Sequence, residues 1–373
     1  MNSVETKDPA SGRLESSWGW LKNTLLEGGP GFCQFAINNA CNAGCDFCSF
    51  NFDKLPKEHW EFVPLKQARE AIEILCRQGI RYLVLTGGEP MMHPDYLEII
   101  RCASGMGMNV LLVTNGSMLN EARIQALKDH GLSSVILSID AASADLHEEN
   151  RRLPGVCERM RMANQLFKEA GIQSTASVTM NHLIDDYAKL PAFLKSLGFE
   201  SVTFSYPLKT LSSSFLGYAD SYLVDYGPKE LSEVFDQVKA LKNGFQVVNP
   251  TASLDEMQRF LRKEPQLFPC LGGYKYFYLD WKLLLWRCHY WEKPMCSIYE
   301  FTDASLIRDG CTRCMIDCYR DSSVMQHVAV SVSDAVGHAR KGRLMAAART
   351  LFTRANYLSL RSVFESLRWI RRI

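Results

Sequence analysis

The sequence predicts an α/β fold in which six strand–helix units form a partial (β/α)6 barrel of the TIM type. Between about residues 33 and 250, short apolar segments alternate with segments of helical length, a pattern typical of parallel βαβ units. The apolar segments are almost uninterrupted, as expected of strands covered on both faces. A closed barrel of this type has eight units, so six units predict a barrel that does not close.

The individual elements follow in chain order. Strands are predicted at 32–37, 80–86, 109–114, 133–139, 173–179 and 201–206. Helices are predicted at 65–79, 95–107, 120–131, 157–171, 185–198 and 228–241. Several helical segments end in glycine, a common helix stop. Ligands of such sheets bind at the C-terminal ends of the strands, so the residues that follow each strand are the first candidates for a site.

The alternation stops near residue 250. Residues 274–288 predict a short antiparallel hairpin that turns near Asp280–Lys282, and the chain is helical again from about 332. We therefore expect an N-terminal extension, a barrel, a small hairpin domain and a helical tail, which cover residues 1–30, 31–250, 251–325 and 326–373.

Composition excludes several classes of function. The net charge is +1, which gives no general preference for nucleic acid. The first twenty residues contain no apolar run, so no secretory signal is expected, and no apolar run approaches the ~20 residues that span a bilayer. We expect a cytoplasmic protein, whose thirteen cysteines stay reduced. Clustered cysteines in such a protein are typically metal ligands or catalysts.

Three cysteines, Cys41, Cys45 and Cys48, lie together directly after the first predicted strand, in NNACNAGCDFCSFN. A four-iron cluster usually takes four thiolates. Three protein ligands leave one iron open to a substrate or cofactor, as the open position does in catalytic zinc sites. This pattern predicts a [4Fe–4S] cluster with one open iron. A zinc site with a distant fourth ligand, or reduced core cysteines, are the alternatives.

The spacing Cys-x3-Cys-x-aromatic-Cys, with Phe47 at the aromatic position, resembles the hallmark of radical S-adenosylmethionine (SAM) enzymes. The resemblance covers about residues 33–320. It implies that SAM binds the open iron through its amino and carboxylate groups. An electron from a flavodoxin- or ferredoxin-type donor would then release a 5′-deoxyadenosyl radical, which abstracts hydrogen from a substrate. The protein would supply binding and shielding, and the cofactors the difficult chemistry.

Polar residues at later strand ends extend the resemblance. TGGEP (86–90) follows the second strand, where glycines let the backbone approach a ligand closely. The resemblance implies SAM contacts from Gly87, Gly88 and Glu89 at the amino group, from Ser138 and Asp140 at the ribose or methionyl part with Asn115 nearby, and from Arg151 at the carboxylate. For each of these residues taken singly, a local role such as capping is the alternative. Arg152 could replace Arg151, and His147 is expected to be structural.

Six further cysteines lie around the predicted hairpin: Cys270, Cys288, Cys296, Cys311, Cys314 and Cys318. A hairpin framed by cysteines and followed by Cys-x2-Cys resembles the auxiliary-cluster extensions called SPASM and twitch. The twitch form implies one auxiliary [4Fe–4S] cluster, with Cys270, Cys288, Cys311 and Cys314 as its ligands, and Cys318 or Cys296 could replace one of them. A four-thiolate zinc site is the alternative. The isolated Cys33, Cys76, Cys102 and Cys157 are expected to be buried core thiols.

The substrate is less constrained. Tyr206, Lys209 and Thr210 follow the sixth strand and could face the cavity, and the aromatic loop 212–227 could cover it. A small-molecule or lipid-linked biosynthetic substrate is the leading hypothesis, with net oxidation if the auxiliary cluster accepts an electron. A peptide-modifying enzyme is second, because the first thirty residues are too short for a peptide-recognition domain. A non-enzymatic, zinc-stabilised binding module is third.

The C-terminal tail is basic. Residues 332–373 contain nine lysines and arginines but only two acidic residues, Asp334 and Glu365. Arg354, Arg361 and Arg368 recur every seven residues. With its apolar residues, this pattern predicts a basic amphipathic helix of the kind that lies on anionic membranes. The alternative is a helix packed on the barrel with its arginines in solvent.

Overall fold

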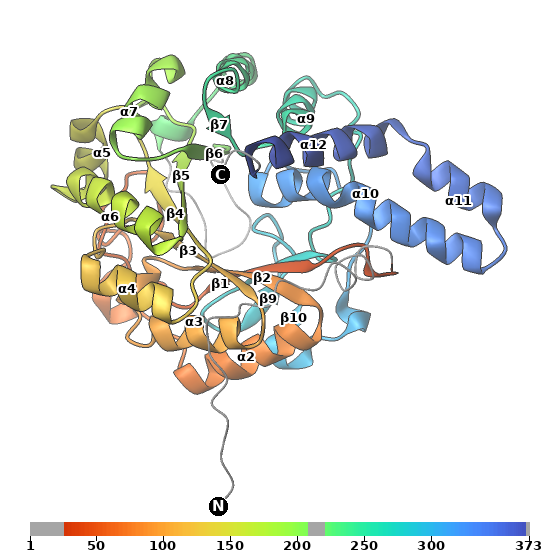
Figure 1. The fold of residues 1–373 in the computed structure, drawn as a ribbon, viewed down its shortest axis with the longest axis horizontal. Helices are drawn as coiled ribbons and strands as arrows, with labels where there is room; N and C mark the ends of the chain where they lie inside the picture. Colours follow the sequence, from red (N-terminus) through yellow and green to blue (C-terminus); the bar gives the residue numbers. More distant parts are fainter. Residues whose placement is uncertain (1–25, 208–220, 371–373) are drawn as a thin grey trace, which may run out of the picture.

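The sheet at the centre of the protein arranges almost every candidate residue (Figure 1). The structure is a computed structural model that describes residues 26–207 and 221–370. Its strands form one sheet in the order β10-β9-β8-β1-β2-β3-β4-β5-β6-β7. The first seven pair in parallel, each with the next: β1 (Gly31–Ala36), β2 (Ile80–Thr86), β3 (Asn109–Thr114), β4 (Ser134–Ile139), β5 (Gln173–Thr179), β6 (Ser201–Ser205) and β7 (Gln246–Val247).

Helices cover the outer face of this curved sheet (Figure 1). They are α2 (Leu65–Arg77), α3 (Tyr96–Gly105), α4 (Glu121–Asp129), α5 (Ala144–Arg151), α6 (Val156–Ala170), α7 (Leu190–Ser196) and α8 (Pro228–Leu241). Short 3-10 turns lie at Lys57–His59, Pro90–Met92, Tyr187–Lys189, Tyr222–Val224, Ile298–Glu300 and Asp303–Ser305. The predicted α/β partial barrel is confirmed. The two-residue strand β7 and the eight-residue helix α5 were not predicted, because neither is long enough to show a clear period.

The two faces of the strands differ in burial. Leu85, Leu112 and Leu137 point to the helices and are fully buried. The alternate residues of the same strands, such as Val113 and Ser138, are only half-buried. Successive strand side chains point to opposite faces, so the half-buried residues line the inner face of the barrel.

The predicted hairpin is present and continues the barrel sheet. β8 (Tyr276–Leu279) pairs in parallel with β1 and antiparallel with β9 (Leu284–Trp286), which pairs with β10 (Cys296–Ser297). Asp280 closes the turn, since its Oδ1 accepts the backbone N–H groups of Lys282 and Leu284, both at 2.9 Å. The hairpin therefore lies beside the first strand of the barrel and close to the loop that follows it.

The C-terminal region is helical, as predicted, but it begins earlier. α9 (Thr251–Leu261), α10 (Asp317–Arg340), α11 (Leu344–Leu351) and α12 (Arg354–Ile370) follow in order. α12 runs back along α10 and reaches α9, and the α10–α11 hairpin projects from the body of the protein (Figure 1). None of the helices in the described ranges is long and apolar enough to cross a membrane.

Candidate active site

The cysteine triplet lies in the loop after β1. Cys41 and Cys45 are buried and Cys48 is half-buried. Two hydrogen bonds fix the loop: the backbone N–H of Gly44 donates to the carbonyl of Arg151 at 2.8 Å, and the side-chain amide of Asn51 donates to the carbonyl of Cys45 at 3.0 Å. Burial first, and then the charges of Cys48 and Glu89, raise the pKa of Cys41 to about 12. The thiols are therefore near one another in a site that disfavours free thiolates, and a bound cation would relieve this cost.

The TGGE segment after β2 packs directly on this loop. A Cβ atom on Gly87 would lie 2.2 Å from the carbonyl oxygen of Asn38, and one on Gly88 would lie 2.2 Å from that of Ala40. Gly87 also has a φ of 143°, in the range that favours glycine. The close approach at these glycines is thus to the backbone that leads into Cys41. Their contact with a SAM amino group stays a prediction.

Glu89 is fully buried and joins the ends of two strands. Its Oε1 accepts hydrogen bonds from Thr114 Oγ1 at 2.8 Å and from the backbone of Met91 at 3.0 Å. Its Oε2 accepts from the backbone of Asn115 at 2.8 Å. Burial raises the pKa of Glu89, and these hydrogen bonds oppose that shift. Glu89 therefore has a structural role in this arrangement, and its predicted role toward SAM stays untested.

Asn42, which the sequence reading did not single out, connects the triplet to β3. Its Oδ1 accepts from the Asn115 side-chain amide at 2.9 Å, and its own amide donates to Ser117 Oγ at 2.9 Å. Asn42 occupies a variable position of the cysteine motif, so spacing alone gives no signal for it. Asn115 is accordingly beside the cysteine loop, and its place near SAM stays a prediction.

Asp140 and Arg151 form a buried ion pair at the end of β4, in which Nη2 lies 2.6 Å from Oδ1. Burial lowers the pKa of Arg151, but Asp140 and the thiols of Cys45 and Cys41 raise it overall. The Nε atom of Arg151 is buried and has no hydrogen-bond partner among the described residues. A buried guanidinium with an unused N–H group beside three thiols is suited to a carboxylate or another anion.

The neighbours of this pair differ in role. Nδ1 of His147 accepts from the backbone N–H of Asp140 at 3.1 Å, which matches the structural role expected of it. Arg152 is exposed and pairs with Asp53 at the surface, away from Asp140. Arg151 is therefore the arginine that pairs with Asp140, because the end of α5 turns the two side chains in different directions, and which of the two contacts SAM stays a prediction. Ser138 lies on the inner face of β4 and is half-buried.

The sequence profile of the radical SAM superfamily matches residues 35–197. Residues 35–197 form a radical SAM domain. The matched range contains the triplet, Gly87–Glu89, Asn115, Asp140 and Arg151. The superfamily implies SAM and a [4Fe–4S] cluster, and the buried thiols and the unused Arg151 Nε fit these groups.

Curated relatives match over the same region. The chain is 28% identical over 166 residues to the AdoMet-dependent heme synthase of Oleidesulfovibrio alaskensis. The matched region is 43% of this chain and 41% of that protein. It is 30% identical over 176 residues to the GTP 3′,8-cyclase of Aquifex aeolicus, which covers 44% of this chain and 53% of that protein. The chain thus spans about half the length of the curated relatives it matches.

Solved structures share the fold. SuiB of Streptococcus suis, bound to its precursor peptide SuiA, has a TM-score of 0.54 at 14% identity and covers 72% of this chain and 61% of its own. HydG, a maturase of the [FeFe]-hydrogenase, has a TM-score of 0.50 at 12% identity and covers 94% of this chain and 85% of its own. At these identities the likeness concerns the fold.

Beside the radical SAM domain, the structure gathers five of the six remaining clustered cysteines: Cys270, Cys288, Cys311, Cys314 and Cys318. Cys270 N–H donates to the carbonyl of Cys311 at 2.8 Å. Burial and the charges of Cys314 and Cys270 raise the pKa of Cys288 to about 12. Cys318 lies in the first turn of α10, next to Gln34 of β1, and interacts with Cys288 and Cys314. Which four bind a cluster stays a prediction.

Cys296 is set apart from this group. It lies in β10 opposite Leu285, and its neighbours are Ser305 and Glu300. The suggestion that Cys296 could replace an auxiliary ligand is therefore wrong for this structure, because the β9–β10 pairing holds it away. In the described ranges, no three histidine, cysteine or carboxylate side chains are arranged to hold a single metal ion.

Cationic side chains surround the second cysteine group. The buried Arg287 pairs with Asp309, Nη1 to Oδ2 at 2.7 Å, and lies 4.6 Å from the ring centre of Trp291. Arg313 lies over the same ring at 4.7 Å. Burial lowers the pKa of Arg287, whereas Asp309, Cys311 and Cys270 raise it overall. Fixed positive charges beside the thiols favour an anionic group there.

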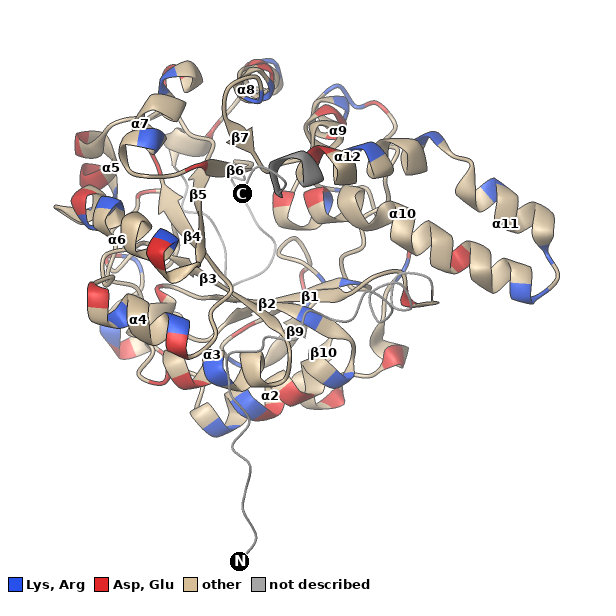
Figure 2. Ribbon diagram, in the orientation of Figure 1, with Lys and Arg blue, Asp and Glu red and all other residues tan. Residues whose placement is uncertain are grey.

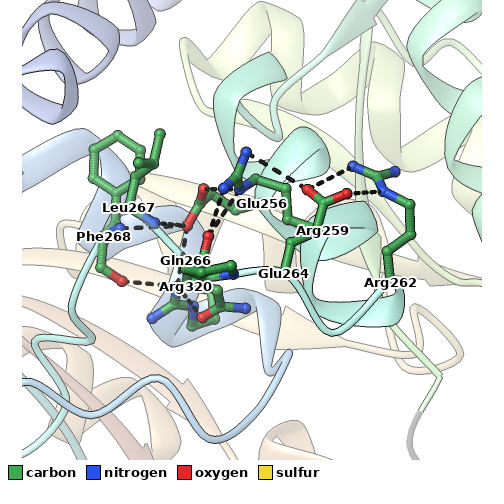
Figure 3. A network of polar contacts seen from close by, with 9 residues as sticks. Glu256, Arg259, Arg262, Glu264, Gln266, Leu267, Phe268 and Arg320 are labelled. Atoms are coloured by element: carbon green, nitrogen blue, oxygen red, sulfur yellow. Dashed lines mark hydrogen bonds and ion pairs between the residues drawn. The ribbon is translucent and has the colours of Figure 1, made fainter.

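A network of polar contacts holds residues 266–268, which precede Cys270 in the chain (Figure 3). Glu256 Oε2 accepts the backbone N–H groups of Leu267 at 2.7 Å and Phe268 at 3.3 Å. Arg320 donates to Gln266 Oε1 at 2.7 Å and to the carbonyl of Phe268 at 2.9 Å. Helices α9 and α10 thereby clamp the segment that leads into the first auxiliary cysteine.

The other predictions concern the isolated cysteines and the residues that follow β6. Cys33 and Cys157 are buried core thiols as predicted, but Cys76 and Cys102 are only half-buried, since both lie at the border of their helices' apolar faces. Tyr206 does not face a cavity. It is buried and donates to Asp321 Oδ1 at 2.8 Å, because β6 ends one residue earlier and turns it toward α10. Lys209, Thr210 and residues 212–220 lie outside the described residues.

Proposed function

We propose that this chain is a radical SAM enzyme that abstracts hydrogen from a small-molecule or lipid-linked biosynthetic substrate. The observation that carries the proposal is the cysteine triplet, with two of its three residues buried, beside Arg151 and inside the range that matches the superfamily. Cys41, Cys45 and Cys48 would hold the [4Fe–4S] cluster. When bound, the cluster and SAM supply an electron and a 5′-deoxyadenosyl radical for hydrogen abstraction.

The protein's own residues hold and orient these groups. Arg151 would place an N–H group against the SAM carboxylate while Asp140 fixes its guanidinium. Glu89 and Asn42 tie the triplet loop to the ends of β2 and β3. A loop held at three points keeps its thiols in position when the cluster is absent, and such preorganisation reduces the cost of binding.

The inner face of the barrel supports a polar substrate. Ser138, Ser177 and Thr203 are cross-strand neighbours in one row, and Thr179 pairs with Ser205 in the next. All five are half-buried. Asp317 adds a carboxylate, with Oδ2 3.4 Å from Ser205 Oγ. Hydroxyl and carboxylate groups on one face suit hydrogen bonds to a small polar molecule or to the polar head of a lipid-linked one.

The second cysteine group supports one auxiliary [4Fe–4S] cluster. Five thiols and the cations Arg287 and Arg313 lie between the hairpin and α10. Such a cluster would accept the second electron of a net oxidation, and the first cluster would take its electron from a flavodoxin- or ferredoxin-type donor. A peptide-modifying enzyme is the second hypothesis; the fold likeness to SuiB is compatible with it. A zinc-stabilised binding module is the third.

The test uses protein purified without oxygen and reconstituted with iron and sulfide. We expect about eight irons per chain, four for each cluster, and 5′-deoxyadenosine after addition of SAM and dithionite. The Cys45→Ser variant should lose the product, whereas Cys33→Ser, a core thiol outside both groups, should keep it. Zinc without iron, together with intact SAM, would overturn the enzymatic proposal and favour the binding module.

We also propose that the chain meets a membrane surface peripherally through its C-terminal helices, and otherwise resides in the cytoplasm. The segment from 335 to 364 contains six lysines and arginines and no acidic residue. Figure 2 shows basic residues along the α10–α11 hairpin and at the start of α12. Part of the predicted amphipathic face is used inside the protein, since Ser359 and Ser362 of α12 are buried. Arg371 and Arg372 lie outside the described residues.

A further inference from the structure

The α10–α11 hairpin projects from the barrel (Figure 1) and carries basic residues (Figure 2), and its tip also exposes the apolar side chains of Leu344, Met345 and Phe352. We propose that α11 and the turn before it, residues 341–352, bind the surface of an anionic lipid bilayer. This inference rests on the peripheral membrane contact proposed above and locates it on α11, away from the Arg354–Arg361 face of α12 that the sequence favoured.

The apolar part of this surface is unusually exposed. Of the fifteen large hydrophobic residues that are exposed in the described chain, seven lie between 344 and 364. Met345 is 71% exposed and Phe352 is 87% exposed. Leu344 and Leu351 share one face of α11 because they are seven residues apart. Met345 follows the first of them, and Phe352, the residue just after the helix, follows the second. Exposed apolar groups gathered in this way typically mark an interaction site.

The other side of α11 is occupied. Ala347 is buried, and α11 lies along α10. The Asn356 side chain of α12 donates to the carbonyls of Thr350 at 2.8 Å and Leu351 at 2.9 Å, and so caps the end of α11. These contacts fix the orientation of α11, so its apolar face stays exposed to solvent.

The basic part adjoins the apolar part. Arg343 and Arg349 are exposed and line a hollow of about 630 Å³ together with His338, Leu344, Met345 and Thr350. Guanidinium groups bind phosphate oxygens through charge-assisted hydrogen bonds. A phospholipid headgroup in this hollow would leave Met345 and Phe352 at the level of the acyl chains, as in helices that lie in the membrane interface.

A bilayer explains both parts at once. Nucleic acid would match the six cations but would leave the exposed Phe352 and Met345 without a contact. A protein partner would need acidic and apolar groups in one patch. Anionic lipid offers negative charge and apolar depth over a continuous surface, which is the complement of this face.

The experiment is flotation of the full chain, with its clusters, on vesicles of phosphatidylcholine alone and of phosphatidylcholine mixed with phosphatidylglycerol. We expect binding to the mixed vesicles only, and weaker binding at high salt. Arg343→Gln with Arg349→Gln should weaken partitioning roughly 30-fold, since each cation contributes about fivefold at such a surface. Met345→Ser with Phe352→Ser should weaken it more than about tenfold.

Matched control variants test whether binding needs this particular surface or any exposed basic or apolar residue. Lys66→Gln with Lys229→Gln, and Tyr222→Ser with Tyr299→Ser, change exposed residues elsewhere and should bind like the unaltered chain. Loss of binding in Leu360→Ser with Phe364→Ser, but not in the α11 variants, would overturn the location on α11. Equal binding to both vesicle types, or release by inorganic phosphate, would overturn the bilayer headgroup. None of these results depends on 5′-deoxyadenosine formation, so failure here is distinct from failure of the enzymatic proposal.

Discussion

Arg151 Nη2 lies 2.6 Å from Asp140 Oδ1, and both side chains are buried beside the cysteine triplet. The carbonyl of the same arginine accepts the backbone N–H of Gly44, between Cys41 and Cys45. One residue therefore joins the end of α5, the end of β4 and the triplet loop. Its contribution to folding and its proposed contact with SAM can be tested separately.

Replacing Arg151 by Met should lower the free energy of unfolding by about 3–5 kcal/mol, because the buried Asp140 carboxylate loses its partner. Arg152→Met is the matched control. Its ion pair with Asp53 is exposed, so its loss should cost at most about 1 kcal/mol. Urea denaturation followed by circular dichroism measures both. Equal losses in the two variants would contradict the burial argument.

Gly88→Ala should disrupt the triplet loop. The new methyl group would lie 2.2 Å from the carbonyl oxygen of Ala40, so the two backbone segments must separate. We expect a loss of more than about 2 kcal/mol in stability and reduced iron uptake by the first cluster. Gly105→Ala, at the end of α3, meets no atom within 4 Å and should change neither. Normal iron content in Gly88→Ala would show that the close packing is dispensable.

Acid should destabilise the protein through His147. Burial and then Arg151 lower its pKa to about 4, from an ordinary value of 6.5. As the pH falls from 6.5 to 4, the unfolded chain takes up a proton that the folded chain does not, so stability declines by about 3 kcal/mol. Above this window the histidine has no effect. His147→Gln should flatten the pH dependence of unfolding, whereas the exposed His59→Gln should leave it unchanged; identical slopes in both variants would refute the assignment.

Iron content should distinguish the clustered cysteines. In the Cys288→Ser variant the iron content should fall from about eight to about four per chain, because the Cys288 thiol lies inside the second cysteine group. Cys296→Ser should keep all of its iron, since β10 holds this residue apart. Cys318→Ser decides whether the thiol in the first turn of α10 is a ligand. A loss of iron in Cys296→Ser would contradict the arrangement described above.

Glu256 should affect the auxiliary site from a distance. Glu256→Gln replaces the carboxylate that accepts from Leu267 and Phe268 and faces Arg320 (Figure 3). Leaving a buried arginine without its anion should cost about 3 kcal/mol and lower iron retention near Cys270. Glu264→Gln lies in the same network but its ion pair with Arg262 is exposed, so that variant should retain its iron. Full retention in both would limit Glu256 to a role in stability.

Much of the fold follows from local patterns. The alternation of apolar and helical segments predicted six of the first seven strands, and the hairpin turn was placed near Asp280–Lys282. The two-residue β7 escaped because a strand that short has no period. The triplet could be recognised because metal ligands on one loop must be closely spaced along the chain.

Other features were decided only by tertiary structure. From the sequence, Arg152 was a possible substitute for Arg151, and Cys296 a possible auxiliary ligand beside Cys318. The end of α5 and the β9–β10 pairing give the two members of each pair different surroundings. Similarly, the seven-residue repeat of arginines indicated α12, whereas α12 packs on α10 and α11 is left exposed. The sequence by itself determined which chemical groups are available and how the backbone is locally arranged. Burial and partners depend on segments far apart in the chain, so only the packed structure decided which of those groups meet.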